Sequence, residues 1–409
     1  MRYIGRSMHL ITTTRELSEL CTRLSRSEFV TVDTEFIREQ TFWPHLCLIQ
    51  LASAAEEAIV DPLAPGIELK PFYELMGHTG VVKVFHAARQ DVEIVWTQAR
   101  LIPHPLFDTQ VAAMVCGFGD SVSYVNLVKE VTGNDLDKSS RFTDWARRPL
   151  TSKQLTYALA DVTYLRDIYK HLKAELAATR REGWLEEEMR TLTDPATYET
   201  RPEEAWRRLK LRVKNRKGLA VLMELAAWRE RAAQAQDVPR NRVLRDEALY
   251  DIASHAPTEV SKLAELRTLS EGFARSARAR EIVEAVKQGL SRDPSTVPPL
   301  RSGMPFPGDK AALLDLLRVL LKACAARHRV AARLIADADD LERIAAEANP
   351  DVPALKGWRH DLFGVHAQRL KRGETALVVR GGEVVPVALE TKPRPPEAER
   401  SPGVSRPSG

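Results

Sequence analysis

The first 190 residues alternate short apolar runs with helical patterns, and this alternation limits the possible folds more than any other feature of the sequence. Apolar or β-branched runs predict buried strands at 28–35, 46–52, 58–61 and 81–85. Helical periodicity is found at 67–77, 88–99, 108–116, 122–132 and 151–190. Strands interleaved with helices predict an α/β domain, with helices packed on a sheet, over residues 1–195.

Strand patterns nearly vanish after this domain. Two helical blocks of similar length follow, at 203–290 and 308–390, and they could be a diverged repeat. Between them, the linker 291–307 holds five prolines, which neither a helix nor a sheet can accommodate. Two short strands around Gly381-Gly382 predict a hairpin at the end of the second block. Residues 391–409 are rich in Pro, Ser and charge, which predicts a disordered tail.

Composition restricts the class of protein. The 409 residues are 44% hydrophobic, which suffices for a core in each of two to four domains. No apolar run approaches the ~18 residues of a membrane span, and the start lacks the pattern of a signal peptide. The four cysteines lie far apart, which argues against disulfides and structural zinc. We therefore expect a cytoplasmic protein that does not associate with membranes.

The net charge of +4 is unevenly distributed. Residues 1–190 carry 22 Lys and Arg against 26 Asp and Glu, whereas the remainder carries 38 against 30. Residues 1–190 could therefore bind cations, while the remainder, the rear half of the chain, could bind a polyanion. Two ordinary domains of different isoelectric point are the alternative, and charge alone favours that alternative.

Asp33 and Glu35 end the first predicted strand. Side chains two residues apart on a strand share one face, and open α/β sheets bind their ligands at this carboxyl end. Two carboxylates so close resist ionisation unless a cation joins them, and a hard ion such as Mg²⁺ or Mn²⁺ suits oxygen ligands. Without further support, a D-x-E pair is more often a solvated turn.

Two other places supply that support. Asp91 opens a helix after the strand 81–85, and Tyr157 and Asp161 share one helix face at i and i+4. Asp91 could instead be a first-turn acid that complements the helix dipole. Tyr157 and Asp161 could instead be a half-buried aromatic beside a surface acid. Four carboxylates at one crevice predict a phosphodiester hydrolase that uses two metal ions about 3.5–4 Å apart. The sequence contains no P-loop, HExxH, GxSxG or GxGxxG motif.

Two nearby residues have simpler interpretations. We expect a structural role for His86, which precedes the Asp91 helix. Asp108 could be a fifth metal ligand, but an Asp-Thr pair at the start of an apolar helix favours an N-cap.

The rear half carries a basic run at 207–217 without an acid. Part of the run could be ordinary solvated surface, but we expect contact with a phosphate backbone. Trp206 and Trp228 are expected to pack in the helical core rather than to stack on bases. The candidate nucleic-acid-binding residues are Arg207, Arg208, Lys210, Arg212, Lys214, Arg216 and Lys217.

The predicted site residues occur in VDTEF at 32–36, FHAARQDVE at 85–93 and YALAD at 157–161. These segments resemble the three motifs of the ribonuclease D family, in the tyrosine subclass of the DEDD superfamily of 3′→5′ exonucleases. The stretches FDTQVAA at 107–113 and DWARRPLT at 144–151 are also similar to that family. The resemblance covers nearly the whole chain, because 203–290 and 308–372 resemble its paired HRDC domains.

The resemblance implies a ribonuclease-H-like domain with a mixed sheet flanked by helices, followed by two small all-α HRDC-like domains. It implies that Asp33 bridges both ions, and that Glu35 and Asp161 complete the site of the ion that carries the attacking water. Tyr157 would orient that water, and Asp91 would serve the second ion. Where the family usually has glycine in its second motif, this chain has Ala88, which leaves only the local backbone geometry open.

The implied activity is metal-dependent 3′→5′ removal of 5′-mononucleotides from RNA, with tRNA precursors as the expected substrate, by a monomer without a nucleotide cofactor. A DNA exonuclease of the repair or proofreading type is one alternative, although no helicase P-loop or polymerase-length extension supports it. A non-catalytic nucleic-acid-binding module is the other. The presence of all four carboxylates and the tyrosine favours an enzyme.

Overall fold

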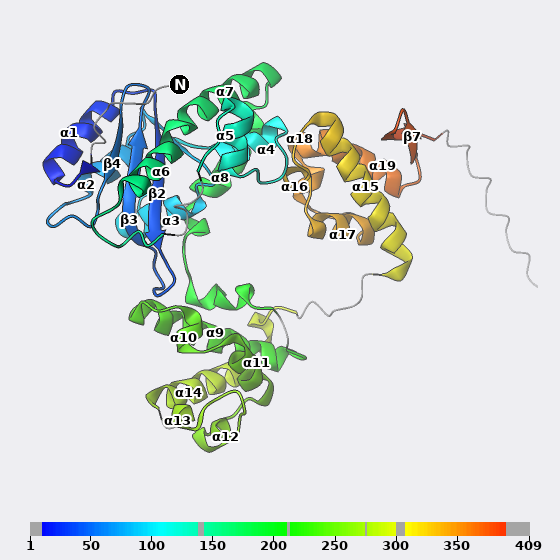
Figure 1. The fold of residues 1–409 in the computed structure, drawn as a ribbon. Helices are drawn as coiled ribbons and strands as arrows, with labels where there is room; N and C mark the ends of the chain where they lie inside the picture. The colour runs from blue at the N-terminus through cyan, green and yellow to red at the C-terminus, as the bar shows by residue number, and fades with distance from the viewer. Residues whose placement is uncertain (1–9, 138–142, 211–212, 275, 300–306, 390–409) are drawn as a thin grey trace, which may run out of the picture. The chain divides into compact units, whose positions relative to one another are not determined.

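The computed structural model describes residues 10–137, 143–210, 213–274, 276–299 and 307–389. The chain forms two compact units, 1–304 and 305–409 (Figure 1). The predicted tail, Arg212 and part of the predicted linker lie outside the described residues. In the described part of the chain, no helix is both long enough and apolar enough to cross a membrane.

A six-stranded mixed sheet forms the centre of the α/β domain in the first unit, as the family resemblance implies. Its strands lie in the order β1 (Leu10–Ile11), β4 (Glu57–Val60), β3 (His45–Ala52), β2 (Phe29–Ile37), β5 (Val82–Phe85) and β6 (Leu106–Asp108). Strand β3 runs antiparallel to both of its neighbours, and the other pairs are parallel. Strands β1 and β6 were not predicted, because two or three residues are too few to show a pattern.

Strand β3 and the first four residues of β2 are buried on both faces, which explains the nearly continuous apolar sequence of β3. Every residue of β3 after His45 is buried. Thr31 shows what covers one face of β2, because its hydroxyl donates to the backbone oxygen of Val162 at 2.9 Å. Val162 belongs to helix α6 (Ser152–Thr163), which packs against β2, β3 and β4.

The other helices of this domain are α1 (Thr14–Leu24), α2 (Lys70–Gly77), α3 (Arg89–Ala99), α4 (Thr109–Cys116), α5 (Tyr124–Thr132), α7 (Leu165–Thr179) and α8 (Glu182–Thr193). The prediction of one long helix over 151–190 is wrong, because that segment is divided among α6, α7 and α8. Arg180 ends α7 in the left-handed conformation, with φ of 56°. A left-handed residue cannot continue a right-handed helix, so the chain turns there.

A helical domain completes the first unit. It contains the 3₁₀ segment η2 (Pro202–Arg208) and the helices α9 (Arg216–Gln236), α10 (Arg240–Val243), α11 (Asp246–His255), α12 (Val260–Ala264), α13 (Glu271–Ala274) and α14 (Ala277–Ser291). Helix α14 lies so close to α9 that a Cβ at Gly289 would come within 2.5 Å of the Cα of Val221. Trp228 is buried and donates its indole N–H to Glu281 at 2.7 Å, and the half-buried Trp206 packs against the same core. Both tryptophans are therefore in the helical core, as predicted.

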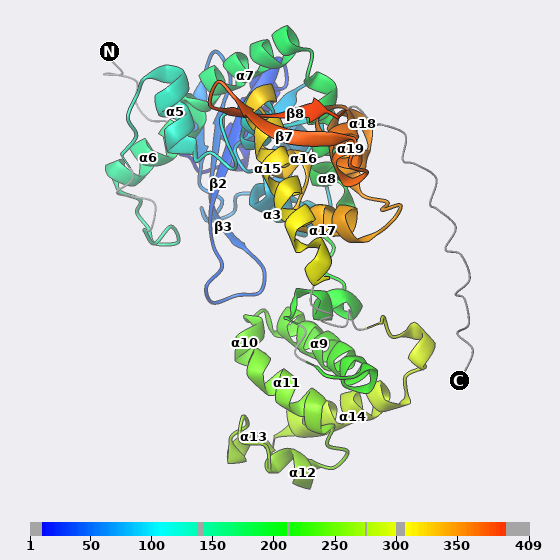
Figure 2. The ribbon, with the colours of Figure 1, turned by 90° about the vertical axis from the view of Figure 1, so that its right-hand side faces the viewer.

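The second unit consists of α15 (Ala311–His328), α16 (Ala332–Ile335), α17 (Ala338–Ala346), α18 (Gly357–Arg359), the π-helical turn η6 (His360–Gly364), α19 (Val365–Lys371), β7 (Thr375–Arg380) and β8 (Glu383–Ala388). Figure 2 shows β7 and β8 as the predicted hairpin, and β8 packs against α15. The segment α15–α17 repeats the order of α9–α11. In each case a long helix ends at a left-handed residue, Asp237 or Arg329, and a helix of four residues follows.

Candidate active site

Three carboxylates from two elements meet at the end of the central strand. Asp33 and Glu35 project from β2 on the face that α6 covers, and Asp161 projects from α6. Each of these residues offers a carboxylate oxygen, and the three oxygens lie within 4.8 Å of one another. The pairing of β2 with β3 is irregular between Glu35 and Phe36, and such a bulge re-aims side chains beside a site. The predicted cluster of Asp33, Glu35 and Asp161 is therefore present in the structure.

Asp91 approaches the same strand from another helix. It lies in the first turn of α3 and is buried. The hydroxyl of Thr34, which points away from the Asp33 face of β2, donates to Asp91 Oδ1 at 2.5 Å. Asp91 lies outside the group of three that could share an ion, but it lines the same pocket as they do.

The electrostatics of these groups favour a bound cation. Burial raises the pKa of the Asp33 carboxyl well above its usual range, and the neighbouring Asp161 carboxylate raises it further. Burial also raises the pKa of Asp91, and Asp33 adds to that effect. A divalent cation would relieve this repulsion, and a set of oxygen donors fits Mg²⁺ or Mn²⁺.

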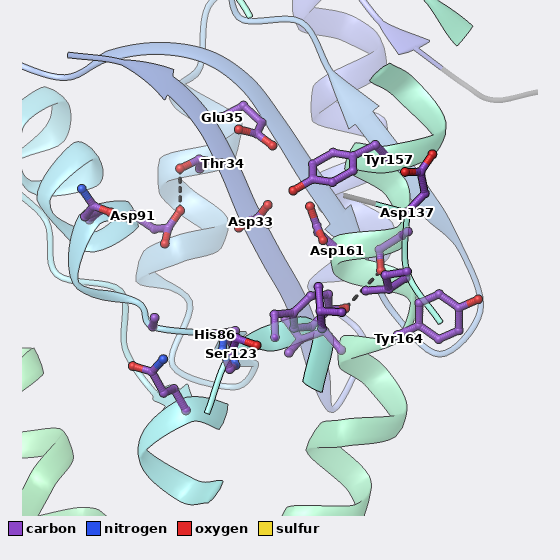
Figure 3. A pocket seen from close by; sticks show the side chains of 18 of the residues that line it. Asp33, Thr34, Glu35, His86, Asp91, Ser123, Asp137, Tyr157, Asp161 and Tyr164 are labelled. Carbon is purple, nitrogen blue, oxygen red and sulfur yellow. Dashed lines mark hydrogen bonds between the residues drawn. The ribbon is translucent and has the colours of Figure 1, made fainter. Parts of the chain in front are cut away.

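Helix α6 places the tyrosine beside the carboxylates. The helix begins at a capping box, in which Thr151 and Gln154 satisfy each other's backbone N–H groups. This start fixes the helical phase, so Tyr157 and Asp161 face the same way one turn apart. In Figure 3 the Tyr157 hydroxyl points toward the carboxylates.

A pocket of about 910 Å³ contains all five predicted residues. Lys153 and Asp137 lie on its wall as well, with Lys153 Nζ 3.9 Å from Asp137 Oδ2. Among the described residues that line the pocket, Lys153 is the one lysine or arginine, and five side chains are acidic: Asp33, Glu35, Asp91, Asp137 and Asp161.

Asp108, which lies next to the second motif, has a structural role. Asp108 caps α4 through the N–H groups of Gln110 and Val111, and it also accepts from the N–H groups of Ala87 and Ala88. The N-cap interpretation of Asp108 is therefore confirmed. His86 lines the pocket, and its Nδ1 lies 3.0 Å from the Thr109 hydroxyl.

The left-handed residue in this turn is Ala87, with φ of 60°, whereas Ala88 has a helical φ of −51°. Alanine at position 88 is therefore compatible with the backbone.

The six described basic residues of the run 207–217 are all exposed, and two of them also have partners within the helical domain. Arg208 pairs with the buried Glu230 at 3.6 Å, and Arg216 donates to the backbone oxygen of Val297 at 2.5 Å. The four others within the described part of the chain are Arg207, Lys210, Lys214 and Lys217.

Sequence reasoning missed Thr34 and Lys153, which line the pocket, and Gln50, which is paired with Asp33 across β2 and β3. Thr34 stands between Asp33 and Glu35, but its bond to Asp91 depends on tertiary structure. Lys153 lies one helical turn before Tyr157, a spacing that could have indicated it. Gln50 interrupts the apolar run of β3, and this polar residue in a buried strand was the available signal.

Comparisons with known proteins agree with this geometry. A family model described as 3′-5′ exonuclease matches residues 8–177, and the HRDC domain model matches residues 218–286. The ribonuclease D of Nitrobacter hamburgensis is 55% identical over 380 residues, which cover 93% of this chain and 99% of that protein. The ribonuclease D of Bartonella henselae is 46% identical over 381 residues, which cover 93% of this chain and 94% of that protein.

A solved structure extends the similarity to the whole fold. The crystal structure of ribonuclease D from Escherichia coli, described as an exoribonuclease involved in structured RNA processing, aligns with a TM-score of 0.77 and 30% sequence identity. The alignment covers 90% of this chain and 99% of that one. Similarity over such lengths includes both the catalytic domain and the helical region behind it. The chain therefore belongs to the ribonuclease D family of hydrolytic 3′→5′ exoribonucleases.

Proposed function

We propose that this chain shortens RNA from its 3′ end by one nucleotide at a time, with two Mg²⁺ or Mn²⁺ ions, and releases 5′-mononucleotides. The observation that carries the proposal is the group of three carboxylates in one pocket with Asp91 and Tyr157. Precursors of tRNA, whose 3′ extensions need trimming, are the proposed substrate. The proposed active form is the monomer, because the site is built from one chain.

Each residue has a role that follows from its position. Asp33, Glu35 and Asp161 would hold the ions, and Asp91, fixed by the Thr34 hydroxyl, would complete the set. When bound, the ions supply a nucleophile at neutral pH and stabilise the charge on the leaving oxygen. The Tyr157 hydroxyl would donate a hydrogen bond to the attacking water, or accept one from it, and so orient the water.

The pocket also needs a group that attracts the substrate, because five carboxylates repel a phosphate backbone. Lys153 can supply this attraction at the pocket wall. Its pair with Asp137 is exposed, with side chains 64% and 71% accessible, so RNA can replace that partner at little cost. The exposed Arg207, Lys210, Lys214 and Lys217 are proposed to contact RNA farther from the site.

The proposal is tested by digesting a 3′-extended tRNA and a single-stranded DNA with a tail of equal length. We expect stepwise shortening of the RNA tail with Mg²⁺, none with EDTA, and little loss of DNA. Preferential loss of DNA would instead identify a repair-type exonuclease.

Variants separate the enzyme from a binding module. Asp33→Asn, Asp91→Asn or Asp161→Asn should abolish turnover while RNA binding largely remains. Tyr157→Phe should be less severe, because only the orientation of the water is lost. Full activity in Asp161→Asn would show that the metal site is assigned incorrectly, and an inactive wild-type protein that binds RNA would be a module without catalysis.

A further inference from the structure

A buried amide lies next to the carboxylates without a bonding partner of its own. Gln50 on β3 is 0% exposed. Within the described residues, neither its Oε1 nor its Nε2 has a hydrogen-bond partner. A buried amide without a partner is costly, so such a group requires an explanation.

The sheet register places Gln50 beside Asp33. The two residues are paired directly across β2 and β3, and directly paired residues project to the same face. On the same face of β3, Leu48 shares a core cluster with Ala158 of α6. Ala52 is paired with Thr31, whose hydroxyl bonds to the backbone oxygen of Val162.

Gln50 lies between Leu48 and Ala52 along β3, so it faces the part of α6 between Ala158 and Val162. Asp161 belongs to this part of the helix. The amide is therefore enclosed by the strand that carries Asp33 and the helix turn that carries Asp161.

We propose that Gln50 is a positioning residue for the metal site, and that its amide N–H donates to an oxygen of Asp33 or Asp161 when those carboxylates hold ions. This inference rests on the proposed metal-dependent function. Ligand carboxylates are commonly held by hydrogen bonds from behind, and a neutral amide can do so without adding charge. The buried amide then gains a partner in the loaded protein.

The test compares Gln50→Leu with Thr31→Val, a matched variant that removes a bonded hydroxyl from the same face. Mn²⁺ affinity is measured by calorimetry without RNA, and the melting temperature is measured in EDTA. Gln50→Leu should weaken Mn²⁺ binding about 10-fold or more. Its melting temperature in EDTA should equal or exceed that of the wild type, because the lost amide had no partner.

Thr31→Val should show the opposite pattern, with a lower melting temperature and nearly unchanged Mn²⁺ affinity. The proposal is overturned if Gln50→Leu lowers the melting temperature in EDTA while Mn²⁺ affinity is unchanged, which identifies a structural role, or if neither quantity changes. Gln50→Met is a second variant of similar length for the case in which leucine prevents folding. A wild-type protein that binds no Mn²⁺ would contradict the proposed function itself, which distinguishes the two failures.

Discussion

Asp33 illustrates a conflict between function and stability at a single residue. Burial and Asp161 raise the pKa of its carboxyl in the metal-free protein, so the folded state holds a proton that the unfolded state releases. The contribution of Asp33 to the stability of the metal-free protein should therefore be fully present below the ordinary aspartate pKa and be lost as pH rises through the raised value.

Asp33→Asn removes the ionisable group and should raise the free energy of unfolding at pH 7 by about 1 kcal/mol or more. Urea unfolding in EDTA at several pH values checks this, and the variant should show a weaker pH dependence than the wild type. A less stable variant at pH 7 would mean that the metal-free carboxylates do not repel each other.

Ala87 stores strain in the turn before α3. Its φ of 60° costs an L-residue about 1–2 kcal/mol, and Asp108 holds the turn by accepting from the N–H groups of residues 87 and 88. Ala87→Gly should therefore raise the free energy of unfolding by about 0.5–1 kcal/mol, after the entropy of glycine in the unfolded chain is deducted.

Ala88→Gly is the matched control, because Ala88 has a helical φ and glycine there should lower stability. Urea unfolding of both variants decides between them. If Ala88→Gly stabilises the protein and Ala87→Gly does not, the strain lies at Ala88 and its assignment to Ala87 is wrong.

Site residues could be predicted from the sequence where the local period of a strand or helix determines which face their side chains occupy. The period of a strand places Asp33 and Glu35 on one face, and the period of a helix does the same for Tyr157 and Asp161. The Thr34–Asp91 bond was not predictable, because it joins groups 57 positions apart in the chain.

At the scale of elements, α6 presents three pocket-lining residues on one face. Lys153, Tyr157 and Asp161 are spaced by four residues, and all three line the pocket. Lys153→Ala should raise KM for RNA severalfold and change kcat little, because the lysine attracts the backbone without touching the reacting atoms. The slope of log affinity for RNA against log salt concentration should also become shallower by about the amount that one phosphate contact contributes.

Lys70→Ala is a suitable control for this variant, since Lys70 is an exposed lysine on α2 that does not line the pocket. Lys153→Arg should restore most of the affinity. A fall in kcat at unchanged KM would instead assign Lys153 to the chemical step.

The boundaries of elements were predictable where capping residues accompany a pattern. Thr151 and Gln154 start α6 at the expected place, and Asp108 starts α4. The break at Arg180 was not predictable, because the left-handed residue is an arginine and the helical pattern continues across it. Glycine, the usual signal for such an end, is absent there.

At the scale of the whole molecule, the sequence predicted the α/β front and the helical rear, because strand patterns stop near residue 200. It did not predict how the two are joined within the first unit. Phe42, in the loop between β2 and β3, is 3% exposed and belongs to the core of the helical domain. Its ring lies 4.6 Å from the Arg240 guanidinium, and the N–H groups of Phe42 and Trp43 both donate to Asp237 at 3.0 Å.

This contact predicts that the catalytic and helical domains of the first unit unfold together. Phe42→Ser should lower stability by about 3 kcal/mol and uncouple them. Hydrogen exchange measures the coupling, because Mn²⁺ bound at the carboxylates should slow exchange in α9 of the wild type through the shared unfolding equilibrium. In Phe42→Ser the ion should protect the sheet but no longer α9.

Val379→Ser is the control, since that side chain is 70% exposed on β7 and its loss should leave the protection of α9 unchanged. If Mn²⁺ still protects α9 in Phe42→Ser, other contacts must join the domains. Loss of protection in both regions would mean that the substitution disturbs the metal site itself. Protection of the sheet alone would identify Phe42 as the residue through which the strand that carries Asp33 and Glu35 is coupled to the helical domain.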